Sequence, residues 1–507
     1  MDTSATPTPA TAAPQRLRAN SLRLWHVVAL GLAYMSLAPA IYFNMGFMET
    51  EAGGPVMPLV FIAVTVAILP TAISFAVLNN RRPSAGSAAT WVSEALGTPL
   101  GLWTGWLLTT LYTIACAIYP AYFAIFFNPF LDYFGIHISF WTGAVAGLAI
   151  TAVVAWMLRH DVQLSARSIA IFMSCEAAFV LGLAIYLLVH QAVTGHLTHP
   201  LDPFNPAAAT AGFSGLSLAV IFGVLSIAGV DSVAPVAEEA KTPRSLIPLA
   251  TILVTLGAGL FWTVSSYGYA VAVPVSTVQH YVNQGLVTPV YGIAGQYIGA
   301  AKILVPLTAF SAVIAGFGAS AVCASRLLYA LARHGYTPRP FARLHPHHQV
   351  PWNAAIPAIC FAFAGPVVVG VWQDHNASSA AGWFGGVFVF FALISYSLVN
   401  LTNIVHHLRQ ARKQFNWLTT GLLPALGIVI DGYILYRGFF VSYLGLSFKL
   451  GRSIVILSLA WAALGLLWAL RAWQRSRSHA GRAAADLAAE LRPTPAGALD
   501  ADKEWGR

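Results

Sequence analysis

Long hydrophobic runs recur along almost the whole chain, and short polar or charged stretches separate them. A helix needs about 20 apolar residues to cross the roughly 30 Å hydrocarbon core of a bilayer. Because the runs meet this length, the pattern predicts an all-α polytopic membrane protein with roughly twelve transmembrane helices. We place the predicted spans at 25–47, 55–78, 99–127, 138–158, 168–190, 212–236, 247–273, 302–332, 354–372, 381–405, 417–438 and 452–473.

Two of these runs are interrupted near their middle. The first is broken around 36–40, where Pro39 lacks a backbone donor and small residues weaken the helix. The sixth is broken around 226–229, and Asp231 follows directly beyond. If the chain contains two repeats of five spans, helix six begins the second repeat, so helices 1 and 6 are broken at matching positions. Such a pair predicts an inverted-repeat transporter with its binding site at the bilayer midplane.

Broken helices expose backbone groups that have no partner within the helix. The N–H groups at a new N-terminus suit a carboxylate, and the C=O groups at a new C-terminus suit an ammonium. A zwitterionic amino acid carries both charges. We therefore expect an amino acid to bind largely through the backbone of the two breaks, at Ser36, Leu37, Ala38, Pro39, Ala40, Ser226, Ile227, Ala228 and Gly229.

The composition agrees with a membrane protein, since 57% of the residues are hydrophobic and only 9% are charged. The net charge of +9 raises nucleic-acid binding as an alternative, which the positions of the cations argue against. Of the 27 Lys and Arg residues, all but four fall on one side of the predicted membrane. The exceptions are Lys302, Arg437, Lys449 and Arg452. Because positive loops face the cytoplasm, we expect a multi-pass plasma (inner) membrane protein with both termini cytoplasmic and no nucleic-acid partner.

The predicted spans divide the chain into four parts. They are a cytoplasmic N-tail (1–24), a ten-helix inverted-repeat transporter core (25–405), helices 11 and 12 (406–473) and a cytoplasmic C-tail (474–507). The four cysteines lie inside apolar runs without metal-ligand spacing, and no Walker motif accompanies the spans. We therefore expect no metal site, no cofactor and no enzymatic activity, with the lipid bilayer as the surrounding partner.

Three stretches of the sequence resemble the amino acid–polyamine–organocation (APC) permease superfamily. They are SAGSAATWVSEALGTPLGLWTGW, GVDSVAPVAEEAKTPRSLIPLA and SRLLYALARHGYTPRPFARLHPHHQVPWNA. The resemblance implies a LeuT-like 5+5 inverted repeat plus two C-terminal helices. It also implies that helices 1, 2, 6 and 7 rock against a scaffold of helices 3, 4, 5, 8, 9 and 10. It is much less specific for the substrate.

The resemblance also implies residues near the substrate. The run LYTIACAIY is similar to an antiporter run with a substrate-adjacent Tyr and Cys, which correspond to Tyr112 and Cys116. In arginine/agmatine antiporters an aromatic gate precedes the break of helix six. The matching position here is Leu225, and Phe222 is the aromatic residue nearby. The chain departs from the family at the first break, where LAPAI stands in place of Gly-Ser-Gly-Ile-Phe.

Two acidic residues inside the spans are candidates for gating or proton coupling. A charged group within a span is costly unless it is paired or hydrated. Asp231 is therefore interpreted as a gate or proton-linked acid, with a carboxylate that caps backbone donors as the alternative. Glu176 has no Lys or Arg within one helical turn. It is interpreted either as the carrier of a coupling proton or as a structural, hydrogen-bonded acid.

The sequence thus predicts a secondary active transporter, a permease that moves amino acids across the plasma membrane by alternating access. Symport with a proton and antiport by exchange are both compatible with it. A proton is the expected coupling ion, and sodium stays open. One alternative is an importer of polyamines or other organic amines from the same superfamily, in which Asp231 and Glu176 receive a cation. An alternative from another class is a membrane solute sensor.

Overall fold

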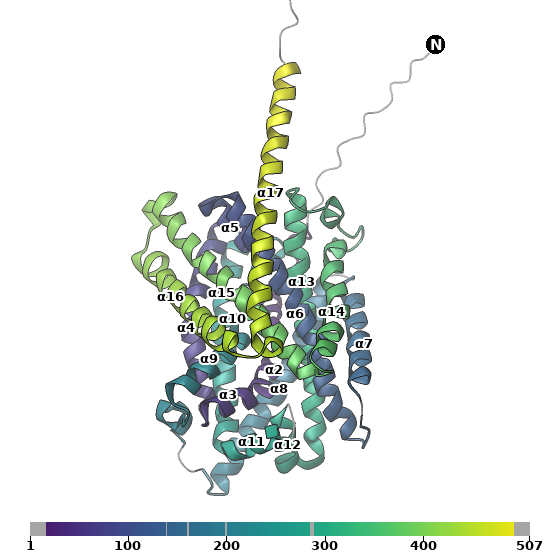
Figure 1. Ribbon diagram of the computed structural model, residues 1–507, viewed down its shortest axis with the longest axis vertical. Coiled ribbons are helices and arrows are strands. Elements are labelled where there is room, and N and C mark those ends of the chain that lie inside the picture. The colour runs from purple at the N-terminus through teal and green to yellow at the C-terminus, as the bar shows by residue number, and fades with distance from the viewer. Residues whose placement is uncertain (1–16, 138, 160–161, 198–199, 284–287, 491–507) are drawn as a thin grey trace, which may run out of the picture.

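The computed structural model describes residues 17–137, 139–159, 162–197, 200–283 and 288–490, and the regular elements in these ranges are helices (Figure 1). Eleven helices in this part of the chain are long and apolar enough to cross a membrane. The shorter apolar helix α9 (Gly212–Ile227) lies between the fifth and sixth of them. Helices suit a bilayer because each satisfies its own backbone hydrogen bonds. The predicted all-α, multi-pass architecture is confirmed.

The helices follow the predicted hydrophobic runs along the chain. The first part comprises α1 (Leu24–Met35), α2 (Leu37–Tyr42), α3 (Asn44–Ala52), α4 (Met57–Arg81), α5 (Ser87–Leu96), α6 (Thr98–Asp132), α7 (Phe140–Leu158) and α8 (Val162–Val193). The second part comprises α9, α10 (Pro243–Ala272), α11 (Val275–Asn283), α12 (Pro289–Ile298), α13 (Leu304–Arg333), α14 (Trp352–Trp372), α15 (Ala377–Arg409), α16 (Leu423–Leu435) and α17 (Ser453–Glu490). Short helical turns join them, among them η3 (Ala234–Glu239) and η5 (Arg339–Ala342).

The first span is interrupted at Ser36. This residue has φ 54° and ψ 78°, a left-handed conformation that ends α1, and α2 begins at Leu37. Residues other than glycine seldom adopt this conformation, because their Cβ crowds the backbone. Pro39 lies in the first turn of α2, where a missing N–H removes no helical hydrogen bond. The interruption is therefore narrower than the predicted 36–40.

The second interruption follows α9. This helix ends at Ile227, Ala228 is extended with φ −67° and ψ 104°, and a turn leads on to η3. Ser226 is still helical, so the interruption begins two residues later than the predicted 226–229. Both interruptions nevertheless fall in the two helices that the sequence singles out.

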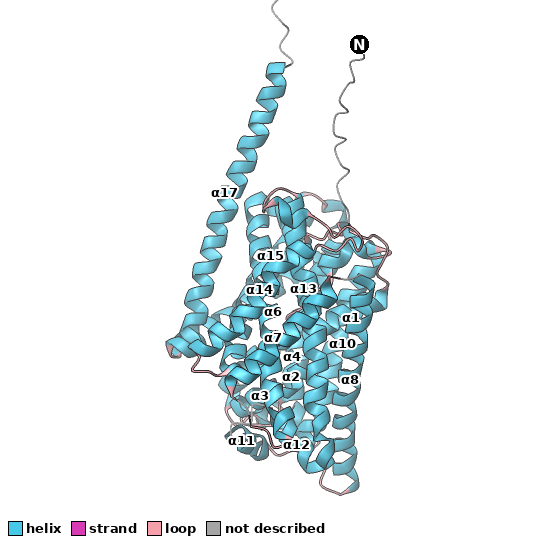
Figure 2. Cartoon of the chain, turned by 90° about the vertical axis from the view of Figure 1, so that its right-hand side faces the viewer, coloured by secondary structure: helices cyan, strands magenta, loops and turns pink. Residues whose placement is uncertain are grey.

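Helix α6 lies at the centre of the bundle and contacts α13, α14, α15 and α17. Helix α10 packs along α4, and α1 contacts α8, α10 and α13. Figure 2 shows that α17 diverges from the bundle, at the end opposite α11 and α12. The described chain also begins at that end (Figure 1).

We expect Gly268→Ala to destabilise the bundle by about 1–3 kcal/mol, the usual cost of overpacking. Small residues let helices approach closely in membranes. A Cβ at Gly268 on α10 would collide with backbone atoms of Ala184 on α8, which cannot swing aside like a flexible side chain. Gly257→Ala on the same helix is the control, because its Cβ would meet nothing within 4 Å. Thermal unfolding in detergent compares the two, and equal melting temperatures would contradict the prediction.

Candidate functional site

A small cavity lies between the two interrupted helices. Helices α1, α2, α3, α6, α9 and α15 contribute to its walls. The described residues that line it are Tyr34, Met35, Ser36, Pro39, Ala40, Asn44, Ala115, Ile118, Tyr119, Tyr122, Leu225, Ser226, Ala228 and Phe388. All of these except Leu225 are buried, so the cavity is occluded in this conformation. None of them carries a charge.

Tyr119 on α6 fixes the first interruption. Its hydroxyl accepts a hydrogen bond from Ser36 Oγ at 2.8 Å and donates one to the backbone oxygen of Tyr34 at 2.8 Å. The ring is held from the other side by α13, because a Cβ at Gly316 would overlap it. The left-handed turn at Ser36 is therefore stabilised by a side chain that also lines the cavity.

Asn44 on α3 ties the second part of the first interrupted helix to α9. Its Nδ2 donates to Ser226 Oγ at 2.7 Å and approaches the backbone oxygen of Phe222 at 3.4 Å. Both contacts involve α9, so they fix the orientation of the amide. Asn44 Oδ1 is buried and has no hydrogen-bond partner among the described residues. The cavity wall thus contains an unused acceptor.

Asp231 lies in the turn that follows α9 and is fully buried. Tyr396 on α15 donates a hydrogen bond to its Oδ1 at 2.5 Å, whereas Oδ2 has no partner among the described residues. Tyr112 and Tyr34 are electrostatic neighbours of this carboxyl group. Within the described chain Asp231 makes no ion pair with Lys or Arg. Asp231 therefore lies in a cluster of tyrosines and does not line the cavity.

Glu176 on α8 is also fully buried. The backbone of Leu37, the first residue after the interruption, lies beside its carboxyl group. Neither carboxyl oxygen makes a hydrogen bond of ordinary geometry within the described structure. Glu176 therefore faces the first interruption from outside the cavity.

The predicted site residues separate into two groups. Those that line the cavity are Ser36, Pro39, Ala40, Leu225, Ser226 and Ala228. Those that do not line it are Leu37, Ala38, Tyr112, Cys116, Glu176, Phe222, Ile227, Gly229 and Asp231. Phe222 instead stacks on Phe47, with ring centroids 4.9 Å apart.

Sequence reasoning missed several lining residues: Tyr34, Met35, Asn44, Ala115, Ile118, Tyr119, Tyr122 and Phe388. Four of them lie on α6 with the i, i+3, i+4, i+7 spacing of one helix face, and this spacing was the available signal. Tyr112 and Cys116 lie on the same helix but are not among the lining residues, and Tyr112 lies one turn before Ala115. Among the described residues, no three His, Cys, Asp or Glu side chains gather as a metal site would require.

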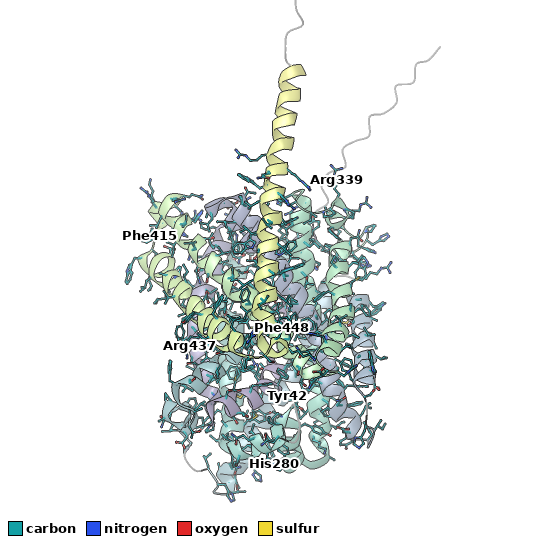
Figure 3. The ribbon with its side chains drawn as sticks, viewed as in Figure 1. Tyr42, His280, Arg339, Phe415, Arg437 and Phe448 are labelled. Atoms are coloured by element: carbon teal, nitrogen blue, oxygen red, sulfur yellow. The ribbon has the colours of Figure 1, made fainter. Side chains whose placement is uncertain are left out.

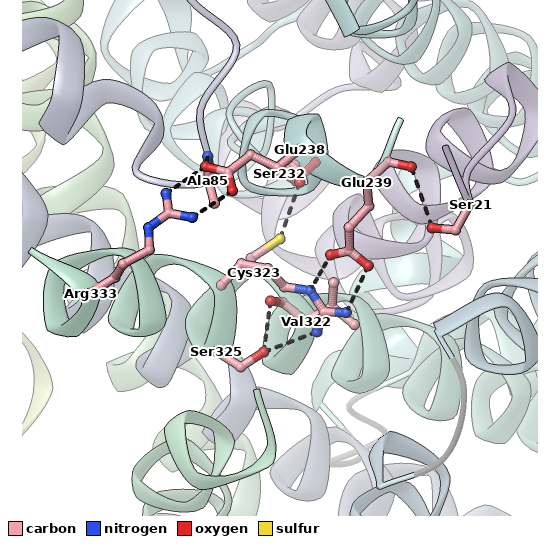
Figure 4. Close-up of polar contacts among 10 residues, drawn as sticks. Ser21, Ala85, Ser232, Glu238, Glu239, Val322, Cys323, Ser325 and Arg333 are labelled. Atoms are coloured by element: carbon pink, nitrogen blue, oxygen red, sulfur yellow. Dashed lines mark hydrogen bonds and ion pairs between the residues drawn. The ribbon is translucent and has the colours of Figure 1, made fainter. Parts of the chain in front are cut away.

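Two ion pairs join η3 to α13 at the end of the bundle where the described chain begins (Figure 4). Glu239 accepts from Arg326 Nε at 2.9 Å, with both side chains almost fully buried, and Glu238 accepts from Arg333 at 2.8 Å. Burial would raise the pKa of Glu238, but hydrogen bonds from Arg333 and from the N–H of Ala85 outweigh it and lower that pKa. The pairs hold η3 against α13.

A bundle of membrane-crossing helices around an occluded cavity between two interrupted helices defines a membrane transporter. Residues 26–447 match the model of the amino acid permease family, and the chain belongs to this family. The low-affinity putrescine importer PlaP of Escherichia coli (strain K12) is 26% identical over 467 residues, covering 88% of this chain and 92% of the relative. The branched-chain amino acid permease BcaP of Bacillus subtilis is 25% identical, covering 59% of this chain and 65% of the relative.

The solved structures include a mutant of the manganese transporter of Eremococcus coleocola, which matches with a TM-score of 0.58. The match covers 90% of this chain and 98% of that chain at 12% identity. At this identity the likeness concerns the fold alone. The LeuT-like transporter fold predicted from the sequence is confirmed.

Proposed function

We propose that this permease carries amino acids with uncharged side chains across the plasma (inner) membrane, with both termini in the cytoplasm. Residues 25–405 would form the transporter core, flanked by the tails 1–24 and 474–507 and by helices 11 and 12 (406–473). The observation that carries the proposal is an occluded cavity with an uncharged lining, placed between two helix interruptions.

The helix ends at the cavity suit the two charges of an α-amino acid. Ala228 N–H bonds to the backbone oxygen of Val224, so the last carbonyls of α9, from Leu225 onward, have no helical partner to the C-terminal side. They would attract an ammonium group, and the amides of Leu37 and Ala38 at the start of α2, which are neighbours in the chain of the lining residues Ser36 and Pro39, would attract a carboxylate. Together the two ends bind the part of the substrate that all amino acids share.

The remaining wall of the cavity would determine the side chain that is accepted. Ile118, Tyr122, Leu225 and Phe388 present mostly apolar surface. The second ammonium of a diamine would be buried there without a carboxylate, which is costly. The polyamine alternative, which the relation to a putrescine importer favours, therefore ranks second.

In proteoliposomes, we expect uptake of a neutral amino acid to be inhibited by other neutral amino acids and not by putrescine. The reason is that the lining residues offer no carboxylate for a second ammonium. Competition by leucine, serine, lysine and putrescine against labelled alanine is the measurement. Stronger inhibition by putrescine than by any neutral amino acid would refute this substrate class in favour of the amine importer.

Asp231 and Tyr396 would form the inner gate beneath the cavity. We expect Asp231→Asn to reduce transport by about tenfold or more, because a hydrogen bond to a charged group is worth about 1.5–3 kcal/mol. Insertion and folding should persist, since asparagine has the same shape. Asp431→Asn is the control, because Asp431 is equally buried but lies on α16, outside the proposed core. Normal flux in a well-folded Asp231→Asn protein would rule out the gate.

Glu176 would carry the coupling proton, because it is buried, lacks an ion-pair partner among the described residues and lies beside the first interruption. We expect Glu176→Gln to abolish substrate accumulation driven by a pH gradient while sparing exchange at equal pH. Glutamine keeps the shape and cannot release a proton. Accumulation assays with and without the gradient, in sodium and in choline buffer, provide the test. Unchanged proton-driven accumulation would place the coupling site elsewhere, and accumulation only in sodium buffer would favour a sodium site.

A further inference from the structure

A groove distinct from the central cavity lies between α17 and the loop that follows α13. Residues from 335 to 339 form one wall, and the part of α17 from Leu464 to Ser476 forms the other. The apolar segment of α17 that can span a membrane ends at Arg477, so the groove lies at the last turns of this span. Figure 2 shows α17 leaning away from the bundle at this level.

Three arginines line the polar end of the groove. Arg471 and Arg475 lie one turn apart on one face of α17, and Arg339 belongs to η5 on the opposite wall. Figure 3 places Arg339 at the end of the bundle from which α17 projects. No Asp or Glu is among the described residues that line the groove. The groove therefore brings together the positive charges of three side chains.

The deeper end of the groove is apolar. Leu464 and Leu467 lie about two turns further into the span and are more than half exposed, and Trp468 forms the adjoining wall. Trp468 is itself held in place by Trp106 of α6, with ring centroids 5.5 Å apart. Thr337 Oγ1 on the facing loop is buried and has no hydrogen-bond partner in the described structure. A ligand that fits must therefore carry negative charge and acceptor oxygens at one end and hydrocarbon at the other.

We propose that this groove binds an anionic phospholipid, with the headgroup phosphate between Arg339, Arg471 and Arg475 and an acyl chain along Leu464 and Trp468. Arginine pairs with phosphate oxygens in a bidentate manner. Basic pockets between helices at the membrane surface suit anionic headgroups. A free phosphate would satisfy the arginines but would leave the apolar end exposed to water. The occupant is therefore a lipid of the surrounding leaflet, and the site is independent of the transported solute.

The test is thermal stabilisation of the full-length protein in detergent by added phosphatidylglycerol, compared with phosphatidylcholine and with inorganic phosphate. We expect phosphatidylglycerol to raise the melting temperature, because a ligand that binds the folded state stabilises it. Each arginine removed should weaken lipid binding by roughly fivefold, given the usual contribution of one cation near an anionic lipid surface. The variant combines Arg339→Gln, Arg471→Gln and Arg475→Gln and should lose the stabilisation.

The matched control replaces three exposed cations away from the groove, combining Arg409→Gln, Arg412→Gln and Lys413→Gln. It changes the net charge equally and should keep the full response to phosphatidylglycerol. Loss of the response in the control as well would overturn the site, because binding would then follow overall charge. Equal stabilisation by inorganic phosphate would also overturn it. Melting temperatures without lipid show whether each variant folds, and transport of neutral amino acids is not needed for the readout.

Discussion

Satisfaction of backbone hydrogen bonds inside a membrane is the constraint on which the rest of this structure depends. A helix interrupted in lipid leaves N–H and C=O groups that need partners within the protein. Side chains of neighbouring helices supply them here. Tyr119 donates to the backbone oxygen of Tyr34, and Trp262 Nε1 donates to that of Leu37 at 3.0 Å. The first interruption is therefore stabilised by hydrogen bonds from side chains of α6 and α10.

The contacts at the interruptions also join the two broken helices into one unit. The Asn44–Ser226 contact links α3 to α9, and a β-bridge between Leu22 and Ala240 links the segment before α1 to the segment after η3. By contrast, the unit is held to α13 through the buried charges of the Glu239–Arg326 pair. Separating a buried pair is costly unless water or new partners reach both charges. This pair therefore opposes the separation of η3 from α13.

The fold could be predicted well from the sequence, because a membrane-spanning helix requires a long hydrophobic run that is easily recognised along the chain. Hydrophobic length reveals the spans, and Pro39 and Gly229 mark the two helices that are interrupted. The prediction was less accurate where contacts between helices decide at which residue a helix is interrupted or ends. Ser36 alone leaves the helix because Tyr119 holds it, and the first span continues as α3 to Ala52 although the hydrophobic run ends at residue 47. No local pattern distinguishes these outcomes.

The candidate site was predictable only in part, for a related reason. The backbone that lines the cavity could be predicted from the interruptions in the helices. The other lining residues depend on which face of each helix is directed towards the cavity. Tyr112 was assigned from a resemblance and lies on nearly the same face of α6 as Tyr119, but two turns earlier, where it packs edge-on against Tyr34 with ring centroids 5.9 Å apart and does not line the cavity. Phe388 on α15 had no signal in its own sequence neighbourhood, because only the packing of α15 against α6 and α9 brings it to the site.

Three buried acids of the described structure lie beside the two interrupted helices. Asp231 follows α9, Glu176 lies beside Leu37, and Glu49 on α3 is buried with both carboxyl oxygens unpartnered in the described structure. None of the three lines the cavity, yet each lies on or against an interrupted helix. An uncompensated charge is far more costly when buried than when water reaches it. A change in the charge state of these acids would therefore act on the positions of the two broken helices, whereas the wall of the cavity carries no charge.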